Sequence, residues 1–132
     1  GLPAKIKGIP RTDSTEELAQ LYSLAQVFVN PTWEDNFPAT NLEALACGTP
    51  VLATRVGGIP DIVTPAHDVG CLVDYGDRAG LAAALETVMA DPAQLARWGA
   101  NGPRVVAETF SVATQSARML ALYEGRNDPR WN

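Results

Sequence analysis

Short apolar runs, many of them β-branched, alternate with longer segments of helical periodicity, and this alternation restricts the chain to few folds. Residues 27–29, 51–54 and 71–73 are such runs, and residues 6–9 form a fourth, short one. Continuous apolar runs of this length are typical of strands buried on both faces of a sheet. Strands that alternate with helices form parallel sheets, because each helix carries the chain back to the same end. The sequence therefore predicts an α/β fold with about four parallel strands and flanking helices.

The helical segments carry recognisable start signals. Ser14 to Glu17 fits a capping box, in which Glu17 would reach back to the Ser14 amide. Helices are predicted over 14–25, 38–47 and 60–63, and after the capping residues Asp77, Asp91 and Ser111. The last predicted helix carries the apolar residues Val112, Met119, Leu120 and Tyr123.

The charge balance and the cysteines narrow the class of partner. The 132 residues have a formal net charge of −5 with 10 Lys and Arg, which argues against nucleic acid as the main ligand. No stretch approaches the ~20 apolar residues that a membrane span requires. Cys47 and Cys71 lack zinc spacing and read as buried thiols in a reducing compartment, so we predict a cytoplasmic protein without metal or cofactor. The single His67 is predicted to lie in a surface loop.

The segment 30–43 carries the chemistry. It leaves the carboxyl end of a predicted strand, crosses a polar loop and enters the helix that starts near Pro38. Ligands of parallel sheets bind where strands end and helices begin, and the first amides of a helix have no acceptor within it. With the positive end of the helix dipole they predict an anion site suited to a diphosphate. The amides concerned are chiefly those of Phe37, Ala39 and Thr40.

Two carboxylates, Asp35 and Glu43, accompany this helix start. Asp35 precedes the helix, and Glu43 lies nearly two turns inside it with a side chain that leans toward the N-terminus. Each carboxylate oxygen accepts two hydrogen bonds, which suits the vicinal hydroxyls of a ribose or a sugar. Acidic residues near a helix start are also common because they stabilise the dipole. The residues alone therefore leave a binding role and a structural role open.

The run EDNFPATNLEALACGTPVLATRVGGIPD resembles the signature of family 4-type retaining glycosyltransferases, which have the GT-B fold. The C-terminal domains of that family carry a Glu-x7-Glu motif, a turn of the form EAxAxGxPV, and then GGxxE. Here Asp35 and Glu43 take the acidic positions of the first motif, residues 42–51 match the second, and GGIPD places Asp61 at the last Glu. The resemblance spans essentially the whole chain and implies a Rossmann-like domain of the GT-B C-terminal type.

By this resemblance, Asp35 and Glu43 would be the catalytic acidic pair, with Glu43 on the ribose hydroxyls of a nucleotide. Asp35 and the amides of Asn36 and Phe37 would hold hydroxyls of the donor sugar. The diphosphate would face amides at the start of the helix, those of Ala39, Thr40 and Asn41. The implied partner is a nucleotide-diphosphate sugar of the UDP or GDP type, and the implied reaction transfers a hexosyl group with retention.

Some positions depart from the family pattern or extend it. Asp35 and Asp61 are one methylene shorter than the Glu of the family motifs, and Pro38 stands where many members have Gly, which removes one amide. Gly58 and Asp61 are further candidates for donor contact, although a glycine pair is more often only a turn. Trp33 could stack on a base or sugar or could pack on the helix below it, and the sequence leaves both open.

Set against the family, residues 1–125 match part of a donor-binding domain truncated at its N-terminus, and residues 126–132 form a polar tail. The first two strand–helix units and the acceptor domain have no counterpart here. Residues 27–29 would then form an open edge of the sheet. We expect either a homodimer that covers this edge or internal pairing with residues 6–9.

Three functions can be weighed at this point. The first is the donor-binding part of a glycosyltransferase, which we expect to be inactive as an isolated chain because no acceptor domain is present. The second is a catalytically inactive remnant or nucleotide-sugar-binding module with the same fold. A nicotinamide-binding domain is disfavoured, because no GxGxxG follows a predicted strand.

Overall fold

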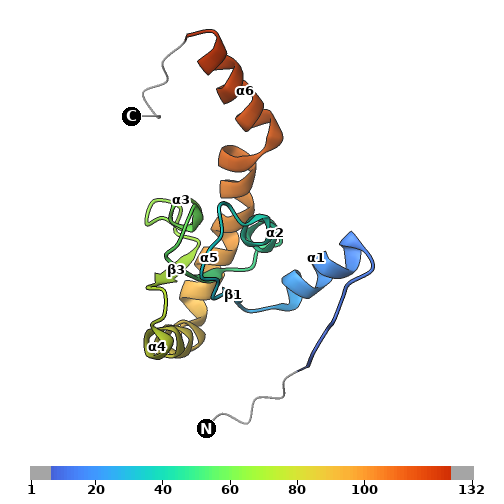
Figure 1. The fold of residues 1–132 in the computed structure, drawn as a ribbon. Coiled ribbons are helices and arrows are strands. Elements are labelled where there is room, and N and C mark those ends of the chain that lie inside the picture. The colour runs from blue at the N-terminus through green and yellow to red at the C-terminus, as the bar shows by residue number, and fades with distance from the viewer. Residues whose placement is uncertain (1–6, 126–132) are drawn as a thin grey trace.

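A sheet of three parallel strands organises the part of the chain that the computed structural model describes, residues 7–125 (Figure 1). The strands β1 (Phe28–Asn30), β2 (Val51–Thr54) and β3 (Gly70–Val73) lie side by side in that order. In the register, Leu52 of β2 is opposite both Val29 of β1 and Cys71 of β3. All four residues of the central strand β2 are buried. The predicted α/β fold with a parallel sheet and flanking helices is confirmed.

Helices follow the sequence signals closely. Their bounds are α1 (Thr15–Leu24), α2 (Ala39–Ala46), α3 (Ile59–Ile62), α4 (Arg78–Met89), α5 (Pro92–Val105), a π-helical segment η1 (Val106–Phe110) and α6 (Val112–Tyr123). The predicted caps accept amide hydrogen bonds from the first helical turn through the side chains of Ser14, Asp77, Asp91 and Ser111. One detail differs from the capping box: the Glu17 carboxylate accepts from the Asp13 amide, at 3.1 Å, instead of the Ser14 amide.

The core lies where α2 covers β1 and β2, and α5 packs on α2. Leu45 of α2, Val51 of β2 and the α3 residues Ile59 and Ile62 are fully buried there. Removing a side chain of this size from water stabilises the fold by about 1.5–3 kcal/mol. The short helix α3 is therefore fixed against the sheet by two buried isoleucines, which matters for the site below.

The predicted strand at residues 6–9 is wrong for the part that can be examined. Residues 7–9 have no regular structure and are exposed, while Ile6 lies outside the described residues. A strand is stabilised by hydrogen bonds to a neighbour, and none of the described strands pairs with this segment. The sheet therefore has three strands instead of about four, and the internal pairing of 6–9 with β1 is absent from it. The polar tail at 126–132 lies outside the described residues.

The strand β1 differs from its expected burial. It hydrogen-bonds to β2 alone within the described residues, and its three residues are half-buried instead of fully covered. The side of β1 that faces away from β2 is the sheet edge for which the sequence predicted either a homodimer or pairing with residues 6–9.

The helix α6 extends away from the sheet (Figure 1). Its apolar side chains Val112, Met119, Leu120 and Tyr123 are all exposed, Tyr123 by 85%. No helix within residues 7–125 combines the length and the apolar character that crossing a membrane requires.

Candidate functional site

The loop between β1 and α2 is held by its backbone. The Gly58 amide donates to the Asn36 carbonyl at 2.9 Å. Gly57 has φ +52°, and a Cβ atom there would lie 1.7 Å from the Asp35 carbonyl oxygen. Only glycine combines this left-handed conformation with such a close approach. The glycine pair before α3 therefore supports the loop between β1 and α2, and the Gly58 amide is already used within the protein.

The strand β2 fixes the start of the same loop. The hydroxyl of Thr54, the last residue of β2, donates to the Thr32 carbonyl, and the Thr32 hydroxyl donates to the Glu34 carbonyl at 3.0 Å. Thr54 is buried, so this bond is shielded from competing water. The loop is thus fixed from the end of β2 and from the turn that follows it.

At the start of α2, several amides point to no protein acceptor. Within residues 7–125, the amides of Asn36, Phe37, Ala39 and Thr40 donate no hydrogen bond to the protein. Pro38 is the N-cap and provides no side-chain cap. Unpaired amides at the positive end of a helix are the groups that bind phosphate oxygens. The helix start is therefore chemically able to hold an anion.

Asn41 is placed differently from these amides. Its amide donates to the Pro38 carbonyl at 3.2 Å, and its side chain is fully buried. The Asn41 Oδ1 atom accepts from Asn30 Nδ2 at 2.9 Å, which ties the end of β1 to the first turn of α2. The geometry of Asn41 thus orients the helix start relative to the sheet.

Glu43 is exposed on α2 and faces α1. Its Oε2 atom accepts a hydrogen bond from the Tyr22 hydroxyl at 3.2 Å. Both residues line a groove of about 290 Å³ between α1 and α2, together with Leu18 and Cys47. Burial and the nearby Glu43 carboxylate raise the pKa of Tyr22 to about 12, because both disfavour the charged phenolate.

The other two acidic candidates, Asp35 and Asp61, make fewer contacts than Glu43. Asp35 is half-buried, with its backbone against Gly57, and Asp61 is exposed in the first turn of α3. Within the described residues, neither carboxylate has a side-chain hydrogen bond or an ion pair. Phe37 packs its ring on Phe110 with centroids 5.7 Å apart, which anchors the loop end to η1.

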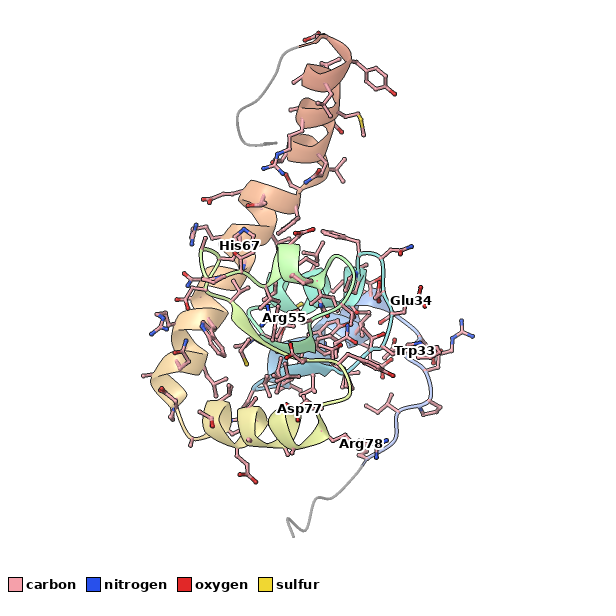
Figure 2. All side chains as sticks on the ribbon, turned by 60° about the vertical axis from the view of Figure 1, so that its left-hand side comes forward. Trp33, Glu34, Arg55, His67, Asp77 and Arg78 are labelled. Atoms are coloured by element: carbon pink, nitrogen blue, oxygen red, sulfur yellow. The ribbon has the colours of Figure 1, made fainter. Side chains whose placement is uncertain are left out.

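Trp33 is 73% exposed, so most of its side chain is accessible to solvent. Figure 2 shows Trp33 and Glu34 together at the outside of the molecule, well apart from His67. His67 lies in a loop, as predicted, and is half-buried, because its Nδ1 atom lies 2.7 Å from the Ile62 carbonyl and its ring meets Phe110 edge-to-face. Its contacts are structural.

A second cavity lies at the carboxyl ends of the strands. It has a volume of about 340 Å³ and is lined by Pro31, Thr54, Asp74, Asp77 and Arg78. Figure 2 shows Asp77 and Arg78 at the start of α4. Arg55 forms an exposed ion pair with Asp74 at 3.4 Å. Asp77 is occupied in capping α4.

Known proteins can now be set beside this geometry. The family model described as "Glycosyl transferases group 1" matches residues 1–105. The chain belongs to this glycosyltransferase family. Its fold agrees, because the structural neighbours of the domain are GT-B glycosyltransferases.

Individual relatives of this glycosyltransferase domain are similar over most of its length. The MMP alpha-(1->4)-mannosyltransferase of Mycolicibacterium hassiacum is 38% identical over 111 residues, which cover 84% of this chain and 27% of that enzyme. The sucrose-phosphate synthase of Thermosynechococcus elongatus is 39% identical, with a TM-score of 0.74 over 83% of this chain and 27% of that one.

A third neighbour supports the fold alone. The C-terminal domain of a glycosyl transferase group 1 family protein from Francisella tularensis superposes with a TM-score of 0.69 at 23% identity, covering 79% of this chain and 53% of that domain. The glycosyltransferase domain described here spans about a quarter of the length of the mannosyltransferase that it matches.

Two features of the site could not be predicted from the sequence. The Tyr22–Glu43 hydrogen bond joins residues 21 positions apart, and the Gly57–Gly58 support meets a loop more than 20 residues earlier. Nothing local in the sequence marks Tyr22 as a partner of Glu43. The glycine pair was visible as a turn, but nothing local in the sequence names the loop that it touches.

Proposed function

We propose that this domain binds the donor of a glycosyltransferase that moves a hexosyl group from a nucleotide-diphosphate sugar to an acceptor. The observation that carries the proposal is the set of unpaired amides at 36, 37, 39 and 40 on a backbone fixed by Gly57 and Gly58. Hydrogen-bond donors that are already in place need no reorganisation when negative charge develops on a departing diphosphate. The family assignment supports the same class of donor.

In this proposal, different residues bind different parts of the nucleotide sugar. The amides of Ala39 and Thr40 face the diphosphate, while Asp35 and the amides of Asn36 and Phe37 face sugar hydroxyls. Glu43 accepts hydrogen bonds from the ribose. Asp61 lies on α3 beside the glycine pair and is a secondary candidate for the donor.

The reaction is proposed to retain the anomeric configuration. A relative named for an alpha-(1->4) linkage supports this, since an α-linked nucleotide sugar gives an α-linked product with retention. The chain's contribution is electrostatic: positioning of the donor and stabilisation of the leaving diphosphate by the start of α2. We propose that the domain works in the cytoplasm, where nucleotide sugars of the UDP and GDP type would reach it.

Calorimetric titration of the 132-residue chain with UDP, GDP, ADP and inorganic diphosphate tests the proposal. One nucleoside diphosphate is expected to bind more tightly than inorganic diphosphate, because ribose contacts add to those of the diphosphate. Equal affinity for all four compounds, or none for any, would contradict donor binding.

Transfer itself is proposed to need an acceptor-binding domain in addition to this one. Orientation of two substrates supplies a large part of the rate of such reactions. Incubation of this chain with labelled nucleotide sugars and simple acceptors is therefore expected to yield no glycoside. Turnover by the chain alone would overturn this part of the proposal, while binding without turnover in a longer protein would favour a binding module.

A further inference from the structure

The hydrogen bond between Tyr22 and Glu43 lies beside the proposed nucleotide site but has no role in it so far. The Tyr22 hydroxyl donates to Glu43 Oε2 at 3.2 Å, across the groove between α1 and α2. Within residues 7–125, Glu43 forms no ion pair with a Lys, Arg or His side chain. The phenol is thus the group that restrains an otherwise exposed carboxylate.

Tyr22 is itself firmly held. Its side chain and backbone together are 8% exposed, and its ring meets Phe28 of β1 edge-to-face with centroids 5.4 Å apart. The Tyr22 carbonyl accepts from the Thr49 hydroxyl at 2.5 Å and from the Ala25 amide at 2.9 Å. The hydroxyl therefore has a fixed position relative to β1 and to the turn between α2 and β2.

We propose that Tyr22 is a positioning residue, which holds one oxygen of Glu43 so that the remaining lone pairs are presented to the ribose hydroxyls of the donor. A carboxylate has about four acceptor positions, and a single phenol uses one of them. An unrestrained glutamate loses side-chain freedom when it binds a ligand, and a restraint present beforehand reduces that loss. This inference rests on the proposed function, since it requires Glu43 to bind ribose.

The direction of the hydrogen bond supports the assignment. The phenol donates and Glu43 accepts, and the raised pKa of Tyr22 agrees with this direction, since a phenolate would lie beside the negative charge of Glu43. Tyr22 and Glu43 also line the groove of about 290 Å³, so a ligand can reach the Glu43 carboxylate without breaking its hydrogen bond to Tyr22.

The test compares a ribonucleotide with its 2′-deoxy analogue in calorimetric titrations of the full chain and of Tyr22→Phe. The probes are UDP, GDP and ADP with their 2′-deoxy counterparts. The substitution keeps the ring and removes the hydroxyl. It is expected to raise the Kd of the ribonucleotide by roughly three- to tenfold and to raise the Kd of the 2′-deoxy analogue, which keeps only the 3′-hydroxyl, by a smaller factor. Tyr123→Phe, on the exposed face of α6, removes the same hydroxyl far from the site and should change neither value.

The outcomes separate this inference from the proposed function. If Tyr22→Phe weakens both nucleotides equally, the tyrosine has only a structural role and the inference is wrong. If Glu43→Gln removes the preference for ribose while Tyr22→Phe leaves it intact, the inference fails and the proposed function stands. If Glu43→Gln also leaves the preference intact, Glu43 does not bind the ribose and the inference fails. If the wild-type chain binds no nucleotide, the proposed function fails and the inference with it.

A second measurement examines the pair without any ligand. Titration of phenolate absorbance should show one tyrosine that ionises near pH 12 in the wild-type chain. In Glu43→Gln this tyrosine should ionise at lower pH, because the neighbouring negative charge is gone. An unchanged titration would show that the two groups do not interact in solution, and would overturn the inference on its own.

Discussion

The loop at residues 31–38 and the loop at residues 64–70 are both polar, yet they use their polar groups in opposite ways. In the first, the backbone is fixed by Gly57, Gly58 and Thr54, while the carboxylates of Glu34 and Asp35 have no hydrogen bond or ion pair among the described residues. In the second, side chains do the fixing. The difference separates groups that are available to a ligand from groups that are already used.

Asp68 is the centre of the second loop. Its Oδ1 atom accepts from Trp98 Nε1 at 2.8 Å, its Oδ2 atom accepts from Arg97 Nε at 2.7 Å, and its carbonyl accepts from Asn101 Nδ2 at 2.9 Å. The hydrogen bonds from Arg97 and Trp98 lower the pKa of Asp68. These hydrogen bonds connect the loop to α5, and they leave the polar groups of Asp68 engaged within the protein.

This contrast has a general physical reading. A ligand site needs polar groups that are fixed in space and still unpaired, which requires the restraint to come from somewhere other than those groups. The first loop meets the condition because glycine contacts and a buried threonine hold its backbone. The second loop does not, and its role is to join α5 to the sheet.

The largest effect is expected for Gly57→Ala. A Cβ atom 1.7 Å from the Asp35 carbonyl oxygen must displace the loop, and the left-handed φ adds strain of about 1–3 kcal/mol. Nucleotide affinity should fall more than about tenfold, since each misplaced donor to a charged group costs about 1.5–3 kcal/mol. Titration calorimetry and thermal unfolding measure the two effects.

Gly76→Ala is the matched control for that substitution. Gly76 has φ +82°, but a Cβ atom there would meet nothing within 4 Å. It should show the strain of the left-handed conformation without the loss of affinity. Equal loss of affinity in both variants would mean that the loop support at Gly57 does not matter for binding.

Asp68→Asn should affect the other loop and spare the site. The substitution removes the charge that Arg97 and Trp98 share, so Tm should fall while nucleotide affinity stays the same. Asp74→Asn provides the comparison, because its exposed ion pair with Arg55 at 3.4 Å contributes little to stability. If Asp68→Asn has the Tm of the wild-type chain, or if it loses nucleotide affinity, the proposed difference between the two loops is wrong.

A smaller effect is expected from pH. The folded pKa of Asp68 is lowered, so its stabilising contribution is present above the unfolded value of about 3.9 and is lost as pH falls through the folded pKa. The difference in Tm between the wild-type chain and Asp68→Asn should therefore be present at neutral pH and shrink below about pH 4. A difference that persists at low pH would assign the effect to packing instead of charge.

The weakest effect concerns β1, the strand that enters the first loop. β1 pairs with β2 alone among the described strands, and an open apolar edge favours pairing with a second copy. Light scattering over a concentration series should show a mass that rises above the monomer. A monomer mass at high concentration, with normal helix content, would mean that the edge is covered or inert.

Much of the fold could be predicted because its signals are local. The caps Ser14, Asp77, Asp91 and Ser111 each start a helix as expected, and the apolar run at residues 51–54 is the central strand. A cap acts on amides two or three residues away, so four or five consecutive letters contain the whole interaction.

What could not be predicted depends on distant partners. Burial of the apolar residues on α6 requires something to pack against, and strand formation at residues 7–9 requires a neighbouring strand. The unpaired helix-start amides were foreseeable from Pro38 onward. Their support by Gly57, and the contact of Glu43 with Tyr22, arise from segments that meet only in the folded chain.

The most direct test of donor binding is one pair of titrations, with the nucleoside diphosphate that binds in the panel, into the wild-type chain and into Glu43→Gln. Glutamine keeps the shape and can still accept from Tyr22, but it loses the charge toward the ribose. The Kd is expected to rise roughly 10- to 150-fold, the equivalent of about 1.5–3 kcal/mol. Glu86→Gln, on the exposed face of α4, should leave the Kd unchanged. An unchanged Kd in Glu43→Gln, at an unchanged Tm, would remove Glu43 from the site and contradict the account.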